Sequence, residues 1–214
     1  IAFTDINTGW ASGMNGIMLK TTNGGINWVQ QTTSSSVKIF KVQPLNANTV
    51  LAAGFAGFVF KTTNGGTNWQ TMPAFTSTNF YGVNFVNENT GWVCGEPAIY
   101  KTTNGGLNWE QQSIPALSLY GMYFLNENTG WTAGSYPGSL GIVSKTTAGG
   151  ANWVTQYTGS DWLFCLNFKD VNTDEVLYIG KSKDKCLASR IRKHKNDLTF
   201  NEYDVDVFVY ITQK

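Results

Sequence analysis

The stretch KTTNGGINW, residues 20–28, recurs almost unchanged three times: KTTNGGTNW at 61–69, KTTNGGLNW at 101–109 and KTTAGGANW at 145–153. The opening lysines of the four copies stand 41, 40 and 44 residues apart. Self-similarity at a fixed period of about forty residues is the signature of a repeat architecture, in which each unit is one supersecondary structure. This repeat therefore decides the fold.

A second sequence landmark, which contains an Asn-Thr pair, recurs with the same period of about forty residues. It reads FTDINTGWASG at 3–13, LNANTVLAAG at 45–54, FVNENTGWVCG at 85–95, FLNENTGWTAG at 124–134 and, in a degenerate fifth copy, FKDVNTDEVLYIG at 168–180. Each unit holds short runs rich in aromatic and β-branched residues, with Gly, Asn and Pro clusters about every ten residues, and this pattern predicts strands. A unit of this length has room for four strands of about five or six residues plus turns.

The Asn-Gly-Gly inside the repeated stretch predicts a tight turn. Gly adopts positive φ without a Cβ clash, and Asn tolerates the left-handed region while bonding its own backbone. The Trp that follows is expected to begin the last strand and to pack its ring between neighbouring units. The residues expected to hold the repeats together are Asn23, Gly24, Trp28, Asn64, Gly65, Trp69, Asn104, Gly105, Trp109, Gly149 and Trp153.

These features predict an all-β fold: a β-propeller of four-stranded blades, with four clear repeats and a degenerate fifth. One forty-residue sheet cannot bury both of its faces alone, whereas copies arranged around an axis bury each face against the next. A parallel β-solenoid is the alternative, although solenoid repeats are usually shorter than these units.

The motif T-T-N-G-G-x-N-W resembles the Asp-box, or BNR, hairpin, with Asn in place of the usual Asp. The longer unit, NTGWxxG followed by KTTNGGxNW, resembles the propeller repeat of the photosystem II assembly factor type over residues 1–158. The resemblance implies a propeller whose boxes are structural pins rather than catalytic groups. Propellers of this type usually have six or seven blades. Ala148 replaces Asn in the fourth box, so that hairpin is expected to lose its side-chain lock.

Asp-box folds include sialidases, which raises an enzyme hypothesis. Sialidases hold the substrate carboxylate with an arginine triad, because the planar guanidinium makes two parallel hydrogen bonds to a carboxylate. The chain has only Arg190 and Arg192, so a sialidase site is excluded. Glu88 and Glu127 occupy equivalent NENT turns and are expected to be solvated, with a paired-carboxylate glycosidase site as the alternative.

The composition fits a globular chain with a sizeable core. Hydrophobic residues make up 42% of the chain, charged residues 14%, and the formal net charge is +1, which offers no strong attraction for nucleic acid or acidic membranes. No apolar run is long enough for a membrane span. Cys94, Cys165 and Cys186 lack metal-type spacing and are expected to be small buried hydrophobes, so neither a metal site nor a disulfide framework is predicted.

The composition changes near residue 158, which predicts propeller repeats at 1–158 and a separate segment at 159–214. Residues 1–158 contain six lysines and five acids, whereas the rest of the chain carries 18 charged residues. Residues 187–198 are expected to form one basic helix, and 204–212 a strand. The segment is either a divergent fifth blade or a small α+β appendage.

The appendage interpretation rests on a resemblance of EVLYIGKSKDKCLASRIRKHKNDL to the middle of a GIY-YIG nuclease domain. The resemblance makes Tyr178, Arg190 and His194 the candidate catalytic residues, with Arg190 stabilising phosphate charge. It also implies Mg²⁺ and nucleic-acid binding through the tail. The tyrosine of the family's first strand is missing here, and the chain ends before the family's metal-binding glutamate would be reached.

The favoured function is a non-catalytic binding or scaffold module without a cofactor, which recognises protein or glycan through loops on one face. The polar loops 32–38, 76–79 and 135–139 are the expected contact surfaces. Four or five blades leave an open edge, so self-association through that edge is an alternative. The chain starts at Ile1 without a signal-like segment, as a mature or excised piece would. The family resemblance implies a secreted or cell-surface bacterial protein.

Overall fold

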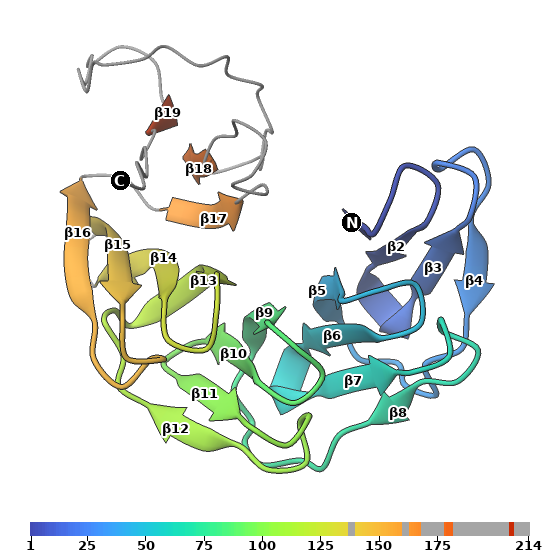
Figure 1. Ribbon diagram of the computed structural model, residues 1–214, viewed down its shortest axis with the longest axis horizontal. Helices are drawn as coiled ribbons and strands as arrows, with labels where there is room; N and C mark the ends of the chain where they lie inside the picture. Colours follow the sequence, from blue (N-terminus) through green and yellow to red (C-terminus); the bar gives the residue numbers. More distant parts are fainter. Residues whose placement is uncertain (137–139, 160–162, 168–177, 182–205, 208–214) are drawn as a thin grey trace.

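The computed structural model describes residues 1–136, 140–159, 163–167, 178–181 and 206–207. The described strands form four antiparallel four-stranded sheets and one three-stranded sheet, set side by side in an arc around a common centre (Figure 1). The first strand of each four-stranded sheet lies nearest the centre and the fourth lies at the periphery. This radial arrangement confirms the predicted β-propeller and rules out the solenoid alternative.

The blades follow the sequence repeat. The first contains β1 (Ala2–Phe3), β2 (Gly9–Ser12), β3 (Met18–Thr21) and β4 (Val29–Gln31). The second contains β5 (Ile39–Pro44), β6 (Val50–Gly54), β7 (Val59–Thr62) and β8 (Gln70–Thr71). The third contains β9 (Phe80–Phe85), β10 (Gly91–Gly95), β11 (Ile99–Thr102) and β12 (Glu110–Gln112). The fourth contains β13 (Ser118–Phe124), β14 (Gly130–Tyr136), β15 (Leu140–Thr146) and β16 (Val154–Gly159).

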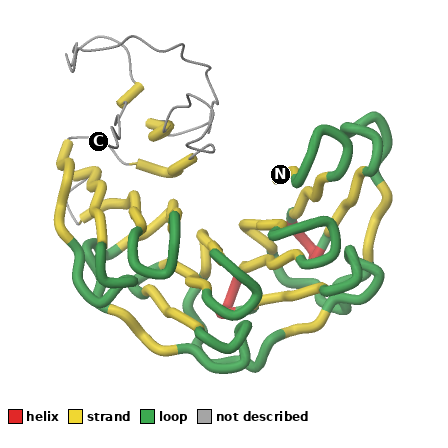
Figure 2. Tube along the Cα trace, in the orientation of Figure 1, coloured by secondary structure: helices red, strands yellow, loops and turns green. Residues whose placement is uncertain are grey.

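Two short 3-10 turns, η1 (Met14–Gly16) and η2 (Phe55–Gly57), connect the second and third strands of the first two blades (Figure 2). Gly57 has φ +79°, and a Cβ at this position would lie 2.0 Å from the Thr76 carbonyl oxygen. Glycine is therefore required there by both backbone conformation and space. No helix in the described part of the chain is long and apolar enough to cross a bilayer.

Three short strands follow the fourth blade: β17 (Leu163–Asn167), β18 (Tyr178–Lys181) and β19 (Asp206–Val207), paired antiparallel in that order. β17 lies beside β13, so this sheet continues the arc (Figure 1). Its pairing with β18 has a register shift between Leu163 and Cys165, as the inner strands of three blades also have. The helix expected at 187–198 lies outside the described residues.

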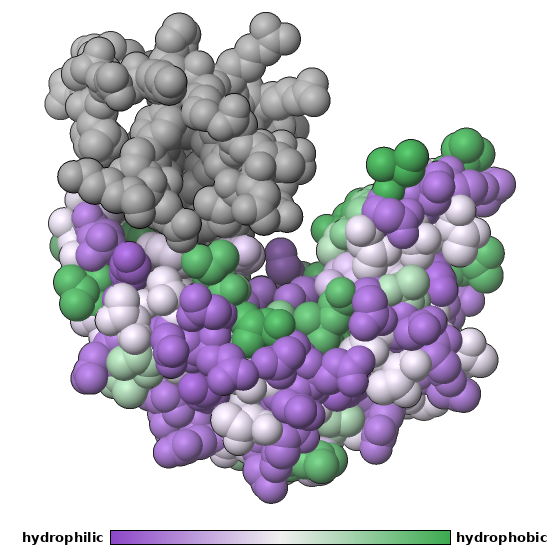
Figure 3. Space-filling view, in the orientation of Figure 1, coloured by the Kyte–Doolittle hydropathy of each residue, from purple (hydrophilic) through white to green (hydrophobic). Residues whose placement is uncertain are grey.

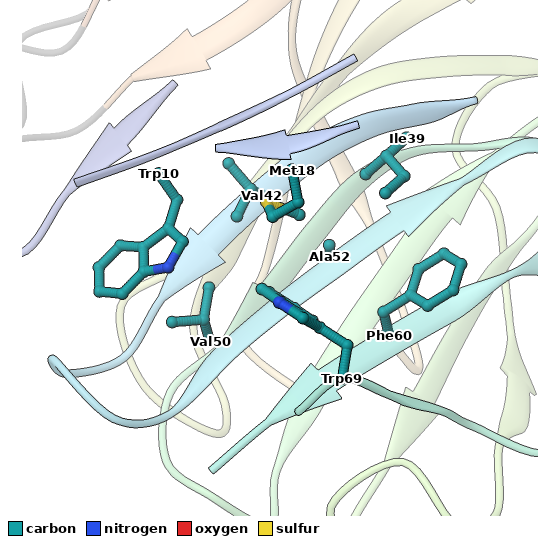
Figure 4. Close-up of a cluster of buried hydrophobic side chains, with 8 residues drawn as sticks. All are labelled: Trp10, Met18, Ile39, Val42, Val50, Ala52, Phe60 and Trp69. Atoms are coloured by element: carbon teal, nitrogen blue, oxygen red, sulfur yellow. The ribbon is translucent and has the colours of Figure 1, made fainter. Parts of the chain in front are cut away.

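The core lies between consecutive blades. Every residue of β6 is buried, and successive side chains point to opposite faces of the sheet. Val50 and Ala52 face the first blade, while Leu51 and Ala53 face the third. The cluster between the first two blades contains Trp10, Met18, Ile39, Val42, Val50, Ala52, Phe60 and Trp69 (Figure 4). Each large side chain of this kind contributes about 1.5–3 kcal/mol on full burial, so a blade depends on its neighbours for stability.

Candidate functional site

Each repeated stretch, hereafter a box, forms the turn between the third and fourth strands of its blade. In the first box, Thr21 Oγ1 accepts hydrogen bonds from the backbone N–H groups of Asn23 (3.3 Å) and Gly25 (2.9 Å). The same hydroxyl donates to Asn23 Oδ1 (3.0 Å), which also accepts the backbone N–H of Asn27 (2.9 Å). The second and third boxes repeat all four bonds. The box asparagines are therefore parts of a structural lock.

The fourth box keeps half of this lock. Thr146 Oγ1 still accepts the backbone N–H groups of Ala148 and Gly150, both at 3.1 Å. The methyl group of Ala148 cannot accept the two bonds that the asparagine receives elsewhere. The expectation that this hairpin loses its side-chain lock is thus wrong in part, because the buried threonine preserves the turn without the asparagine.

The Asn-Thr landmark forms a second turn beside each box. In the third blade, Asn87 Oδ1 accepts the backbone N–H groups of Asn89 (2.9 Å) and Thr90 (2.7 Å). The carbonyl of Asn89 then accepts the N–H of Gly105, the first box glycine, at 2.8 Å. The same contact joins turn and box in the other three blades, so boxes and Asn-Thr turns share one face of the propeller, the box face. Hydrophilic side chains cover most of its described part (Figure 3).

The lysines that open the first two boxes connect their blades to the next one. Lys20 Nζ donates to the carbonyl of Gly65 in the second box at 2.9 Å, and its ammonium lies 5.1 Å from the centre of the Trp10 ring. Lys61 Nζ makes the corresponding bond to the carbonyl of Gly105 in the third box at 3.3 Å. The first box glycine therefore serves two purposes, a positive-φ turn and an inter-blade acceptor.

Three of the four box tryptophans, Trp69, Trp109 and Trp153, lie at joints between blades. Trp69 is 8% exposed and donates its indole N–H to Gln31 Oε1 of the preceding blade at 3.3 Å. Trp153 donates to the carbonyl of Ser113, also in the preceding blade, at 3.2 Å. Trp109 is partly buried against the cluster between the second and third blades. Trp28 belongs to the first blade and packs edge-on against Phe3 of that blade.

The paired carboxylates of the NENT turns also act between blades. Glu88 Oε1 accepts the hydroxyl of Thr49 at 3.3 Å, and Glu127 Oε1 accepts the hydroxyl of Thr90 at 3.2 Å. Both glutamates are exposed, as expected for solvated turns. Because the same contact recurs one blade apart, a structural role accounts for both residues.

The opposite end of the propeller carries the polar loops that were expected to contact a partner. Gly16 N–H donates to the carbonyl of Val37, Phe55 N–H to the carbonyl of Lys38, and Ala56 N–H to Asn79 Oδ1. These bonds place loops 32–38 and 76–79 beside the turns between second and third strands. Tyr136 ends β14 at the same end, while 137–139 lie outside the described residues.

Three aromatic side chains form a row near the centre of this second face. Phe40, Tyr81 and Tyr120 are the extra residues at the β-bulges of β5, β9 and β13. A bulge redirects its side chain, and here the rings of Phe40 and Tyr81 each contact the bulge ring of the next blade. The ring centres of Phe40 and Tyr81 are 5.2 Å apart and those of Tyr81 and Tyr120 are 5.5 Å apart. We call this row the aromatic ladder and the surface that carries it the ladder face.

Charged groups border the ladder. Glu96 stands in the turn that follows β10, and its Oε1 accepts a hydrogen bond from the Tyr120 hydroxyl at 3.2 Å. Burial, with a smaller contribution from the negative charge of Glu96, raises the pKa of both Tyr81 and Tyr120. Lys41 follows the bulge of β5, and the protein around its ammonium group lowers its pKa by desolvation. The ladder face therefore combines exposed ring surface with a carboxylate and an ammonium group.

Further apolar side chains extend this surface. Phe40 is 41% exposed, Phe55 on η2 is 46% exposed, and Leu117 before β13 is 46% exposed. Rings held by a rigid sheet offer contact area to a ligand at little entropic cost. The ladder thus has the chemistry of a recognition surface. Among the described residues, no group of three or more His, Cys, Asp or Glu side chains is placed to hold a metal ion.

The sequence reasoning missed the ladder, although a signal was present. Phe40, Tyr81 and Tyr120 each stand eight residues before the Asn of their Asn-Thr pair, and Phe164 in β17 has the same offset. Glu96 has no counterpart at its position in the other turns, so periodicity could not indicate it.

The remaining candidates lie in the core or the tail. Cys94 is fully buried, as expected, and burial raises the pKa of its thiol to about 12. Tyr178 begins β18 and its backbone pairs with Asn167 of β17. Arg190 and His194 lie outside the described residues, so the nuclease interpretation of these three residues stays a prediction.

Comparison with known proteins identifies the repeat. A family model described as photosynthesis system II assembly factor YCF48 matches residues 1–77 and 69–160. Among solved structures, YCF48 bound to D1 peptide is 22% identical with a TM-score of 0.63, covering 84% of this chain and 58% of that chain. YCF48 from Cyanidioschyzon merolae is 16% identical with a TM-score of 0.64, covering 84% of this chain and 62% of that chain.

Enzymes of the same architecture also match. An ancestral GH74 enzyme is 22% identical with a TM-score of 0.66, covering 86% of this chain and 29% of that one. At these identities the similarity establishes the fold. The chain spans less than two thirds of the length of either solved YCF48 structure. No curated protein sequence matches the chain.

Proposed function

Because the chain belongs to the family of photosynthesis system II assembly factor YCF48, we propose that it is a non-catalytic propeller whose ladder face binds an extended segment of a partner protein. One solved member of the family is described as bound to D1 peptide, which makes a polypeptide the natural class of ligand. The partner of this chain is defined here by chemistry: a segment with apolar side chains that can lie across the ladder.

The aromatic ladder is the observation that carries the proposal. Its rings come from three successive blades, so a ligand that crosses them contacts three rigid sheets at once. Phe40 is exposed while Tyr81 and Tyr120 are partly buried, and aromatic rings of this kind beside polar loops are the composition that recognition surfaces favour. The polar loops 32–38 and 76–79 supply hydroxyl and amide groups at the border of the ladder.

The carboxylates support a non-catalytic role. Hydrolysis of a glycosidic bond requires two carboxyl groups that flank the scissile bond. Glu88 and Glu127, the two that occupy equivalent positions, each bond to a threonine of the preceding blade. Glu96 lies on the other face, next to Tyr120.

A displayed library of random dodecapeptides tests the proposal. Selection on the whole chain should enrich peptides with apolar residues, and calorimetry should give micromolar dissociation constants for them. Tyr81→Ala/Tyr120→Ala should weaken the binding of a selected peptide about tenfold or more, because truncated aromatic anchors dominate such interfaces. Leu107→Ala is the matched control, since this side chain is 57% exposed but stands on the box face.

Two results would contradict the proposed function. Absence of any selected peptide would do so, as would equal loss of affinity in the ladder variant and in Leu107→Ala. A glycan array screened with the same chain covers the second ligand class, since sugars also stack on aromatic rings. Glycan binding without peptide binding would reassign the ladder to carbohydrate.

A further inference from the structure

Two buried hydroxyl groups of the fourth blade have no hydrogen-bond partner among the described residues. Thr132 on β14 is 1% exposed, and Ser144 on β15 is fully buried. Their oxygen atoms, Thr132 Oγ1 and Ser144 Oγ, accept and donate no bond within the described part of the chain, where Trp10 Nε1 is the one other buried side-chain nitrogen or oxygen of which this is true. Native proteins satisfy nearly all buried polar groups with a protein group or an ordered water molecule, because an unpaired one is costly.

The two hydroxyls are neighbours on one face of the blade. Thr132 and Ser144 are paired across β14 and β15, which places their side chains on the same side of the sheet. Ile142 stands two residues before Ser144 and packs with Trp92 and Ile99 of the third blade. Since residues two apart on a strand share a face, both hydroxyls lie at the joint between the third and fourth blades.

This joint also lacks a ring that the two preceding joints have. The residue before the box lysine is aromatic in the second and third blades, where Phe60 and Tyr100 pack toward the preceding blade, but it is Ser144 in the fourth. Met122 stands where the third blade has Val83, and its extra length fills only part of the volume of a ring. An internal water requires space and about two to four polar partners. The exchange of a ring for a serine beside a second hydroxyl supplies both.

We propose that Thr132 and Ser144 together bind an internal water molecule at the joint between the third and fourth blades. Each hydroxyl has one donor and two acceptor positions, so a single water can donate to one and accept from the other. A molecule bonded to both spans hydroxyl oxygens about 4–5.5 Å apart, which suits two side chains paired across adjacent strands. The site does not depend on the proposed function, because it lies inside the joint and away from the ladder.

A high-resolution crystal structure of the whole chain tests the site directly. It should show one water oxygen about 2.8 Å from both Thr132 Oγ1 and Ser144 Oγ. A direct bond between the two hydroxyls, or a bond from each to another protein group, would overturn the proposal, as would a dry space between them.

Two conservative variants test the site in solution, through the sign of the change in stability. Thr132→Val and Ser144→Ala each remove one hydroxyl and should raise the equilibrium constant of unfolding in urea about fivefold, because the water and the remaining hydroxyl both lose a bond. The double variant should lose less than the two single changes together, since it leaves no hydroxyl stranded. Thr155→Val is the matched control: Thr155 is paired with Ser144 on β16 but is exposed, so the constant should stay unchanged.

Hydroxyls that bind no water predict the opposite sign. Removal of an unsatisfied buried group relieves its desolvation cost, so each single variant would then unfold less readily than the parent chain. That result, or an unchanged constant in both single variants, would overturn the proposal.

Discussion

The fourth box carries Ala148 where the other three boxes carry asparagine, and Ala148→Asn should stabilise the chain. The backbone of this turn already matches the others, since Thr146 Oγ1 accepts the same two N–H groups at 3.1 Å each. An asparagine there would receive the Thr146 hydroxyl and the backbone N–H of Asn152. The corresponding bonds in the second box measure 3.0 and 2.9 Å.

The size of the effect follows from these two bonds. One intramolecular hydrogen bond contributes about 0.5–1.5 kcal/mol net, and the bond to the residue-152 N–H is solvent-exposed, which favours the low end. The variant should therefore gain about 1–2 kcal/mol in the free energy of unfolding. For a chain of this length that corresponds to a rise in Tm of roughly 2–8 °C. Urea denaturation followed by tryptophan fluorescence and calorimetry would measure both quantities.

Two comparisons make the test specific. Ala151→Asn places the same amide at the exposed, variable position of the same turn and should leave stability unchanged. Asn104→Ala removes the lock from the third box and should lose about 1–2 kcal/mol. An Ala148→Asn chain no more stable than the parent, or an equal gain in Ala151→Asn, would refute the view that the asparagine locks the box.

Three further outcomes are expected. Gly57→Ala should destabilise the chain by about 2 kcal/mol or more in urea denaturation, because positive φ and a backbone clash act together. Trp92→Phe should cost about 1–3 kcal/mol, because it leaves a buried box carbonyl without the indole N–H that lies 2.9 Å away. In a Cys165→Ser/Cys186→Ser chain, Cys94 should stay unreactive toward iodoacetamide from pH 7 to 9, since its pKa of about 12 keeps the thiol protonated, and should react only on unfolding. Alkylation of the native chain that rises with pH would contradict burial of this cysteine. A ΔΔG near zero for Gly57→Ala or for Trp92→Phe would contradict the corresponding prediction.

The turns were predictable because their chemistry is local. Asn-Gly-Gly specifies a positive-φ turn within a few residues, and Gly24 and Gly25 adopt φ values of +69° and +88°. The Trp that follows is large and recurs at a fixed offset, so its place at a blade joint could be inferred before its neighbours were known. The number and order of the strands followed from the same period.

Contacts between blades were not predictable in this way. The repeated lysine marked the period, but its acceptor is a carbonyl 45 residues away at Gly65, which no local pattern specifies. The ladder depends on a one-residue shift in strand pairing, and a run such as YGVNF does not show which residue will be left unpaired at the bulge. Glu96 is recognised as part of the ladder face only in the folded chain, where its carboxylate accepts the hydroxyl of Tyr120 from β13.

The bonds from Lys20 and Lys61 to the next box glycine have a consequence for how such chains change in length. The second repeat carries an acceptor, Gly65, for the lysine of the preceding blade and a donor, Lys61, for the glycine of the following blade. The two groups therefore belong to different joints between blades. Because the lysine and the glycine recur in all four boxes, a tandem copy of the second repeat would again place a lysine opposite a box glycine. Repeat number can therefore be altered by recombination within the gene without a new interface having to arise first.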